Sequence, residues 1–342
     1  MTPEEALRSH RWCKLIVGAS YHHVPAIRNL ALVYGLAGVS CLDVAADPAI
    51  VRAALAGLDV AQRWGMPHRP WLMVSLNDGE DPHFRKAVFE GDRCPPDCAQ
   101  PCRPVCPTQA IGWLQNGTGE WLGVTADLCY GCGRCLTVCP PQRIETVPQT
   151  YDPLALWRGP LGSEIQAIEI HTQPDRETAF AECWARLAPV IPQLRAVSVS
   201  FPDLPDLESA LRARLAAMHP FPEHLIWQVD GRPMSGDIGR GTSHAAAKLG
   251  TRVLAMGLPG FVQLAGGTND RTPQDLAAAP ALAGAAFGGY GRTLVADLLA
   301  RGGDHLETDA EAFTAAIARA KQLVTAVQGG TPPSPPQICY PA

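Results

Sequence analysis

The sequence predicts an α/β fold in which short buried strands alternate with helices and a cysteine-rich segment interrupts the alternation. Three observations predict it. Apolar runs of the kind that form strands buried on both faces recur along the chain. Once the cysteine-rich segment is removed, these runs lie roughly 25 to 35 residues apart, which leaves room for a helix between them. Glycine and proline stand mostly at the boundaries of the runs rather than in one tract.

Before the cysteine-rich segment, the chain is expected to form three strands and two helices. Pro25 opens the first helix and Gly38 closes it, as expected from the preference for proline in the first turn and glycine after the last. Asp47 is expected to cap the second helix, which ends at Gly65. The three strands are expected over residues 14–20, 40–46 and 71–77.

After the cysteine-rich segment, the alternation resumes with five more strands. Thr242 or Ser243 is expected to cap one helix, and Thr272 to open the next with Asp275 in its first turn. Helical sequence then continues to about residue 328. The strands are expected over residues 165–172, 196–201, 224–230, 261–266 and 285–289, and the other helices over 176–187, 207–218 and 243–256.

Eight strand–helix units in a chain of this length predict a TIM-barrel-like (β/α)8 fold. An open, doubly wound sheet is the alternative, because a count of strands does not establish closure. We expect residues 1–89 to form the first part of the barrel, 90–148 an inserted module, 149–328 the rest of the barrel and 329–342 a proline-rich tail.

Two cysteine runs, each ending in Cys-Pro, predict two [4Fe–4S] clusters. The run from Cys129 to Pro140 has the spacing C-x2-C-x2-C-x3-C-P, in which three sulfurs bind one cluster and the fourth binds its neighbour. In the run from Cys94 to Pro107 the cysteines are separated by three residues, which indicates a looser wrap. This crossing predicts cluster A on Cys94, Cys98, Cys102 and Cys139, and cluster B on Cys106, Cys129, Cys132 and Cys135.

Zinc and disulfides are the alternatives for these cysteines. Structural zinc prefers two separated cysteine pairs, whereas each set of four here is consecutive. Disulfides are not expected where no secretory signal is visible. Segments 110–114 and 121–124 flank a glycine-rich turn and predict a hairpin between the runs, as in two-cluster ferredoxin modules. Of the isolated cysteines, Cys41 is expected in the core.

Two loops of the predicted barrel are rich in glycine. They follow the seventh and eighth strands, where barrels of this class often bind phosphate. A phosphate, or the phosphate of flavin mononucleotide (FMN), is therefore predicted across them, with Arg292 supplying charge; the alternative is that the glycines only make tight turns. The candidate residues are Gly266, Gly267, Thr268, Gly289, Gly291 and Arg292.

Four predicted strands end in polar residues, namely Asp43, Asn77, His171 and Asp230. His171 and Asp230 are the candidate catalytic residues, with His171 as a proton carrier. A histidine at a strand end is also often a hydrogen-bonded structural group, so both interpretations stay open. The glycine-rich loop of residues 231–243 has neither P-loop nor dinucleotide-binding spacing, and an anion site or a lid are equally compatible with it.

Bulk composition excludes some classes of function. A net charge of −5 gives no basic surface of the kind that binds nucleic acid. Residues 1–11 lack the apolar region of an export signal, and no uncharged apolar run is long enough to span a bilayer. We therefore expect a protein of a reducing cytoplasm.

Several motifs together resemble the cyanobacterial light-dependent period protein (LdpA) family. They are residues 14–20, 31–38, 43–48, 235–239 and 260–269, together with the two cysteine runs, so that the resemblance extends from about Lys14 to Arg292. It implies an iron–sulfur protein that reports cellular redox state to the circadian clock. It also implies a clock-input histidine kinase and clock oscillator proteins as partners.

Two hypotheses for the function follow. A redox sensor would accept electrons from a reduced carrier or the quinone-linked pool and change the surface that partner proteins bind. An oxidoreductase would use the clusters to pass electrons to a flavin or phosphorylated ligand on the barrel, although no complete catalytic set is identifiable. A passive scaffold is the third hypothesis and has the least support, because labile clusters are not needed for it. The sensor is our prediction, with the oxidoreductase as the alternative.

Overall fold

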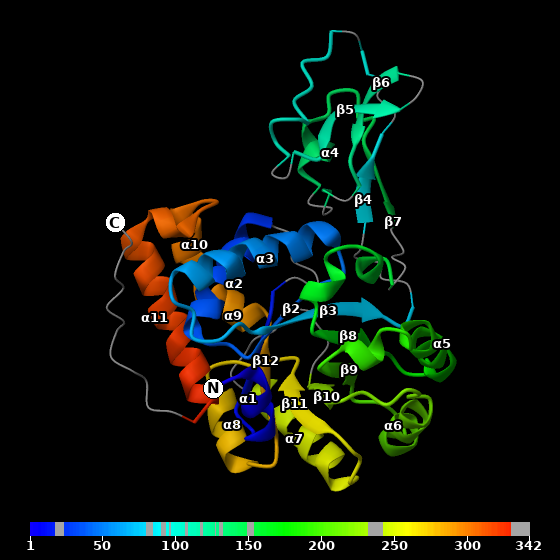
Figure 1. Cartoon of the computed structure of the whole chain (residues 1–342), viewed down its shortest axis with the longest axis vertical. Helices are drawn as coiled ribbons and strands as arrows, with labels where there is room; N and C mark the ends of the chain where they lie inside the picture. The colour runs from blue at the N-terminus through cyan, green and yellow to red at the C-terminus, as the bar shows by residue number, and fades with distance from the viewer. Residues whose placement is uncertain are drawn as a thin grey trace.

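Eight parallel strands close into a barrel in the order β1-β12-β11-β10-β9-β8-β3-β2 (Figure 1). The closure confirms the predicted (β/α)8 architecture and excludes the open sheet. The computed structural model describes residues 1–17, 24–79, 85–89, 94–95, 97–106, 109–116, 119–126, 128–129, 133–148, 154–231 and 242–329. The barrel strands are β1 (Trp12–Ile16), β2 (Cys41–Ala45), β3 (Trp71–Asn77), β8 (Ala167–His171), β9 (Ala196–Pro202), β10 (Leu225–Asp230), β11 (Phe261–Ala265) and β12 (Gly284–Phe287).

The strands lie within a few residues of their predicted positions. The first begins earlier than predicted because Trp12 and Cys13 pair with Gly284 and Ala285, across the seam between β1 and β12 that closes the barrel. Residues 18–20, which the prediction placed in this strand, lie outside the described residues.

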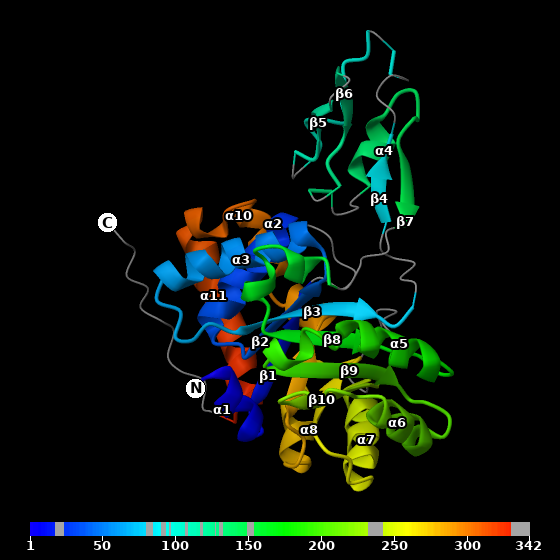
Figure 2. The same cartoon turned by 45° about the vertical axis from the view of Figure 1, so that its right-hand side comes forward.

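Helices pack around the outside of the barrel (Figure 2). Asp47 caps α3 as predicted, since its carboxylate accepts the backbone N–H groups of Ala49 (2.6 Å) and Ile50 (3.3 Å). The expected caps Thr242 and Ser243 instead lie in the first turn of α7. No helix in the described ranges is long and apolar enough to cross a membrane. The helices are α2 (Val24–Ala37), α3 (Pro48–Arg63), α5 (Glu177–Leu187), α6 (Leu207–Ala216), α7 (Thr242–Ala255), α8 (Thr272–Ala278), α9 (Gly289–Thr293), α10 (Ala296–Gly302) and α11 (Ala310–Val327).

One more helix, α1 (Pro3–Arg8), precedes the barrel and was not predicted. Its sequence carries a capping box: the Thr2 side chain accepts from the Glu5 backbone N–H (3.2 Å), and the Glu5 carboxylate accepts from the Thr2 backbone N–H (2.8 Å). Ala6 and Leu7 of α1 are buried against Trp12 at the amino-terminal end of the barrel. Helix α1 therefore closes this end.

Side chains along the barrel strands alternate between two environments. Outward-facing residues such as Leu15, Val44 and Val199 belong to the large core between barrel and helices. The inward-facing residues nearest α1 form a smaller apolar cluster that includes Trp12, Cys41, Trp71, Ala167, Ala196 and Ile226. The next inward-facing positions are polar yet fully buried: Lys14, Asp43, Glu169, Ser198, Gln228 and Gln263.

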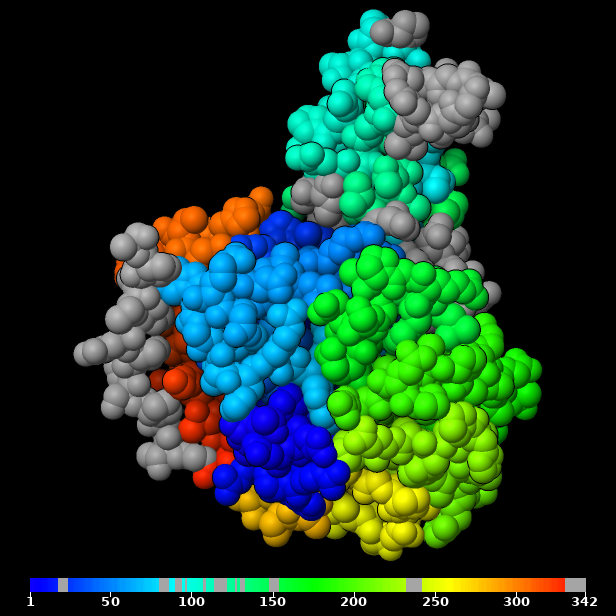
Figure 3. Space-filling model, viewed as in Figure 1, coloured from blue at the N-terminus to red at the C-terminus, as the bar shows by residue number. Residues whose placement is uncertain are grey.

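The cysteine-rich segment forms a module of its own after β3. In it, β4 (Arg85–Val88) pairs antiparallel with β7 (Glu145–Pro148), β5 (Ile111–Asn116) pairs with β6 (Gly119–Val124), and α4 (Arg134–Val138) lies between β6 and β7 in sequence. The β5–β6 hairpin confirms the predicted one. Strands β4 and β7 were not predicted, and β4 lies before residue 90, where the sequence places the start of the module. Figure 3 shows the module as a lobe beside the barrel.

Gly284 is required where the barrel closes. Its φ is +150°, and a Cβ at this position would lie 1.8 Å from the Trp12 carbonyl oxygen. We predict that Gly284→Ala lowers the free energy of unfolding by at least about 3 kcal/mol, because the two backbones must move apart. Gly257→Ala is the control: its φ is also positive, at +62°, but no atom lies within 4 Å, so only about 1 kcal/mol of backbone strain is expected. Equal losses in urea unfolding would contradict the steric argument.

Candidate functional sites in the cysteine module and the barrel

The four cysteines assigned to cluster A come together around one pocket. Cys139 of the second run lies there with Cys94, Cys98 and Cys102 of the first, which is the crossing expected for two-cluster modules. Burial raises the pKa of the Cys102 thiol, and the charges of the other three cysteines raise it further. Four thiolates this close need a cationic group to offset their charge. The pocket is completed by Phe89, Gln100, Pro101, Leu122, Pro140, Pro141, Arg143 and Ile144.

Three of the four cysteines assigned to cluster B pack in the core of the module. They are Cys106, Cys129 and Cys135, while Cys132 lies outside the described residues. The backbone N–H of Ala110 donates to Cys106 Sγ (3.2 Å), and that of Ala87 donates to Cys129 Sγ (3.4 Å). Such bonds stabilise negative charge on sulfur, so both atoms are well suited to bind as thiolates.

The residues present fit an iron–sulfur group. The described donors of both sets are sulfur atoms, the ligand type that such clusters take. The module has a small core, and a metal group bound to its sulfurs would contribute to its folding. Gly133, in the turn before Cys135, has a φ of +73°, a backbone conformation that favours glycine. The buried members of the core are Ala87, Cys102, Ala110, Ile111, Leu122, Cys129, Cys135 and Ile144.

Lys86 connects the module with the barrel. It stands next to Ala87 in β4, and its side chain is only 2% exposed. Its ammonium group donates to the carbonyl oxygen of Ala126 in the module and pairs with the carboxylate of Asp47 (2.9 Å). Asp47 caps α3 of the barrel. Ala87 of β4 therefore contacts a sulfur assigned to cluster B, and the adjacent Lys86 contacts the start of a barrel helix.

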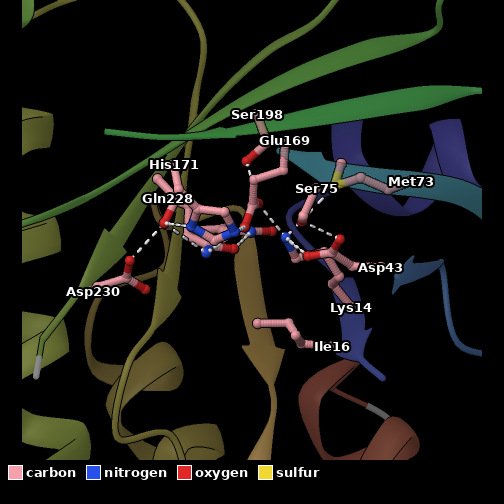
Figure 4. Close-up of polar contacts among 12 residues, drawn as sticks. Lys14, Ile16, Asp43, Met73, Ser75, Glu169, His171, Ser198, Gln228 and Asp230 are labelled. Carbon is pink, nitrogen blue, oxygen red and sulfur yellow. Dashed lines mark hydrogen bonds and ion pairs between the residues drawn. The ribbon is translucent and has the colours of Figure 1, made fainter. Parts of the chain in front are cut away.

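The middle of the barrel holds a buried ion-pair cluster (Figure 4). The Lys14 ammonium pairs with Glu169 and with Asp43 (3.0 Å), and all three side chains are at most 1% exposed. Burial alone disfavours charge on each, but the mutual attraction outweighs it for two of them: the pKa of Lys14 is raised and that of Glu169 is lowered. Burial keeps the pKa of Asp43 above its ordinary value despite Lys14.

Neutral side chains satisfy the remaining polar atoms of this cluster. Ser198 donates to Glu169 Oε2 (2.8 Å) and Gln228 donates to Glu169 Oε1 (2.8 Å). Gln263 in turn donates to the amide oxygen of Gln228, and Trp12 Nε1 donates to Gln263 Oε1 (2.7 Å). A hydrogen-bonded chain therefore runs from the apolar base of the barrel up to the charged cluster.

The candidate catalytic residues His171 and Asp230 lie together just above this cluster. Ser200 Oγ donates to Asp230 Oδ2 (2.5 Å), so it accepts from His171 Nδ1 (3.1 Å). His171 Nε2 then lies 3.5 Å from Glu169 Oε1 and has no hydrogen-bond partner among the described residues. Burial raises the pKa of Asp230 to about 6, although Ser200 and His171 both act to lower it. His171 thus stands between two carboxyl groups, as a proton carrier would, and that role stays a prediction.

The loops predicted to bind phosphate lie beside each other, since Thr268 Oγ1 donates to the Ala286 carbonyl oxygen (2.6 Å). The glycines and the arginine proposed to bind phosphate also make structural contacts within the barrel. A Cβ on Gly267 would meet Thr242, one on Gly291 would lie 2.7 Å from Leu15, and Arg292 donates to the Ile16 carbonyl oxygen (3.0 Å). Phosphate or FMN binding by these loops therefore stays a prediction. Residues 232–241 of the long glycine-rich loop lie outside the described residues.

Sequence reasoning missed the most important residues of the barrel interior. The predicted strands 14–20 and 165–172 contain Lys14 and Glu169, but the sequence predicts no role in a site for either residue. A signal was present, because both are charged residues flanked by apolar neighbours within strands expected to be buried on both faces. Cys41 is buried as predicted, and Cys339 lies outside the described residues.

Two family models match the chain. One is described as the LdpA Fe-S cluster-binding domain and matches residues 94–150; the other is described as the Light dependent period A C-terminal domain and matches residues 161–326. Together they cover the cysteine module and the second part of the barrel.

One relative is similar over nearly the whole chain, and others are similar over a short part of it. "Light dependent period A" of Synechococcus elongatus is 48% identical over 344 residues, which cover 96% of this chain and 96% of that protein. Pyruvate synthase subunit PorD of Thermotoga maritima is 49% identical over 49 residues, 14% of this chain and 46% of its own length. Protein Pixie of Drosophila melanogaster is 32% identical over 75 residues, 21% of this chain and 12% of its own length.

The position of Asp230 predicts a pH-dependent stability. Its folded-state pKa of about 6 exceeds the ordinary value of 3.8, so its contribution to stability is complete below pH 3.8 and is lost as the pH rises through 6. Asp230→Asn keeps an acceptor for Ser200 and removes the charge. We expect it to raise the free energy of unfolding by about 1–3 kcal/mol at pH 8 and by about half as much at pH 5, because at pH 5 the carboxyl group is ionised in the unfolded chain but still largely protonated in the folded protein.

Urea unfolding followed by tryptophan fluorescence at both pH values measures this difference. Asp203→Asn is the matched control, because Asp203 is exposed and pairs with Arg252 at the surface. An Asp230→Asn effect that is the same at pH 5 and pH 8 would show that Asp230 is not held in an unfavourable charged state.

Proposed function

Because the chain belongs to the light dependent period A family and is one of its iron–sulfur proteins, we propose that it senses cellular redox state and reports it to the circadian clock. The electrons come from a reduced carrier or the quinone-linked pool. The proteins that read the signal are a clock-input histidine kinase and clock oscillator proteins. Two [4Fe–4S] clusters are held by the cysteine sets assigned above, and their chemistry is one-electron oxidation and reduction.

The contact made by Lys86 is the observation that carries this proposal. A sensor requires that a change in the module alter a part of the protein that partners can reach. Ala87 donates to the sulfur of Cys129, and the neighbouring Lys86 pairs with Asp47 at the start of α3. A change of charge near Cys129 acts on both residues, because a buried ammonium group responds to the field around it. The capped end of α3 is thus the first part of the barrel to be affected.

The signal is a shift between two positions of the module relative to the barrel. In one position, Lys86 pairs with Asp47 as in this structure; in the other, that pair is weakened and the first turn of α3 loosens. Partner proteins distinguish the two surfaces by binding one more tightly. This explains why redox groups would be placed on an inserted module rather than inside the barrel.

An oxidoreductase is the second candidate function. It is favoured by the group of His171, Ser200 and Asp230 at the carboxyl end of the barrel strands, where enzymes of this fold place their chemistry. In this alternative the clusters deliver electrons to a flavin or phosphorylated ligand. It ranks second because the glycine-rich loops and Arg292 already have partners in the fold.

Loss of a cluster ligand tests the proposed function. Cys135→Ser removes a sulfur ligand and is expected to reduce the iron content of the anaerobically purified protein. In cells it should abolish the dependence of clock period on light intensity. Cys183→Ser is the control, since Cys183 is also a buried cysteine but lies outside the module. If clock period still follows light in cells whose protein has lost cluster B, the sensor proposal fails.

Removal of the Lys86 charge tests the path of the signal. Lys86→Met keeps the length of the side chain but breaks a buried ion pair, with an expected loss of about 3 kcal/mol in stability. We expect its iron content to match the wild type. Hydrogen exchange in the first turn of α3 should differ between the oxidised and reduced wild-type protein, and this difference should disappear in the variant.

Lys248→Met is the control for this experiment, because Lys248 is exposed on α7. It should retain the redox-dependent exchange. A Lys86→Met protein in which α3 still responds to reduction would show that the signal takes another route.

A further inference from the structure

A second group of potential metal ligands lies at the opposite end of the barrel from the strand ends discussed above. Glu4 of α1, Glu223 and His224 each offer one ligand atom, and these three atoms all lie within 4.8 Å of one another. His224 immediately precedes β10. No cysteine belongs to the group, which is therefore chemically distinct from the sites in the module.

The imidazole of His224 is the observation that points to a ligand. Its side chain is 6% exposed, and its Nε2 atom is buried with no hydrogen-bond partner in the described part of the chain. A buried nitrogen without a partner costs about 1–3 kcal/mol, so such atoms are rare unless something binds them. The nearest carboxylate oxygen is Glu4 Oε1, at 3.7 Å, which is too far for a hydrogen bond.

Aromatic neighbours fix the direction of this imidazole. The ring stacks on Trp71, with centroids 6.2 Å apart and an interplanar angle of 18°. Phe261 contacts it edge-on at 5.9 Å and 81°. The ring is therefore held before any ion arrives, and its Nε2 atom faces Glu4. A prearranged ligand of this kind lowers the entropy lost on binding.

The carboxylates are also held in place. Arg8 donates to Glu4 from the next turn of α1 (2.9 Å), and Arg195 lies 3.5 Å from Glu223. Both carboxylates are accessible to solvent, with 42% and 44% of the side chains exposed.

We propose that Glu4, Glu223 and His224 bind a zinc ion that fastens α1 to β10. One imidazole nitrogen with two carboxylate oxygens suits zinc, whereas magnesium and calcium prefer oxygen ligands alone. Ligand atoms around tetrahedral zinc lie about 3.3–3.5 Å apart, because each bond is about 2.0–2.2 Å long. The 3.7 Å between His224 and Glu4 requires only a small adjustment. Water takes the fourth position.

The proposed site has a structural role that is independent of the redox function. Helix α1 closes the amino-terminal end of the barrel through Ala6 and Leu7. It has only six residues, too few for a helix to be stable by itself. A zinc ion that joins Glu4 to residues at the start of β10 would hold the closing helix in place.

Zinc binding by the anaerobically purified protein, with its clusters intact, tests this inference. Native mass spectrometry after addition of one equivalent of zinc should show one bound zinc ion per chain. Glu4→Gln and Glu223→Gln each remove one charged ligand at an exposed position, so the fold is retained. We expect each to weaken zinc binding at least about tenfold.

Glu208→Gln is the matched control, because Glu208 pairs with Arg212 one turn later in the same way as Glu4 pairs with Arg8. It should bind zinc as the wild type does. Zinc should also slow tryptic cleavage after Arg8 and Arg11 in the wild type and in Glu208→Gln, but not in Glu4→Gln. A wild-type protein that binds no zinc, or zinc binding that is unchanged in both ligand variants, would overturn the proposal.

Discussion

The ion pairs of Lys14 with Glu169 and Asp43 are the constraint on which the barrel interior depends. None of these buried charges is stable without its partner, because removing one partner leaves an uncompensated buried charge at a cost of about 3–5 kcal/mol. The three charges are therefore stable only when the strands that carry them, β1, β2 and β8, are in register. Ser198 and Gln228 follow as a consequence, since the remaining lone pairs of Glu169 also need donors, and Gln263 in turn donates to the amide oxygen of Gln228. Most barrels of this class fill the same layer with branched aliphatic side chains, which can pack against one another in many arrangements. The polar side chains of this layer form all their ion pairs and hydrogen bonds in few arrangements, and they place His171 and Asp230 above a fixed carboxylate.

The cysteine module is stabilised in a different way. Its two short strand pairs and one helical turn bury few apolar side chains, and three of the eight residues in its core are cysteines. Thiolates that repel one another do not hold a fold together unless a cationic group binds them. We therefore expect the module to depend on its iron–sulfur cofactor, whereas the barrel has a large apolar core of its own. This difference allows the state of the module to change without loss of the barrel, and Lys86, buried between Ala126 and Asp47, is where the two parts meet.

The sequence predicted the architecture well because each barrel strand carries its own signal. Short apolar runs, the proline and glycine at the ends of α2, and Asp47 before α3 are local features, and each was found where expected. Features that depend on contacts distant in sequence were missed. Strands β4 and β7 have four residues each and exist because they pair across the whole module. The partners of Lys14 come from residues 29 and 155 positions away, so no window of sequence contains the cluster. Thr242 looked like a helix cap, but its hydroxyl donates to Gly267 of a neighbouring loop (2.6 Å).

The two parts are linked by contiguous contacts through β2. Asp43 pairs with Lys14 inside the barrel, and four residues later Asp47 pairs with Lys86 of the module. From Lys14 the contacts continue to Glu169 and from there to His171. A contiguous path is necessary for coupling but does not establish it, because coupling requires an element with two states that both sites influence. In the proposed mechanism the segment from Asp43 to the first turn of α3 takes this role: Asp43 at one end pairs with Lys14, and Asp47 at the other pairs with Lys86, the neighbour of the residue that donates to Cys129. The group of His171 and Asp230 and the sulfur of Cys129 are therefore connected through a short series of contacts, which the redox-dependent exchange of α3 would test.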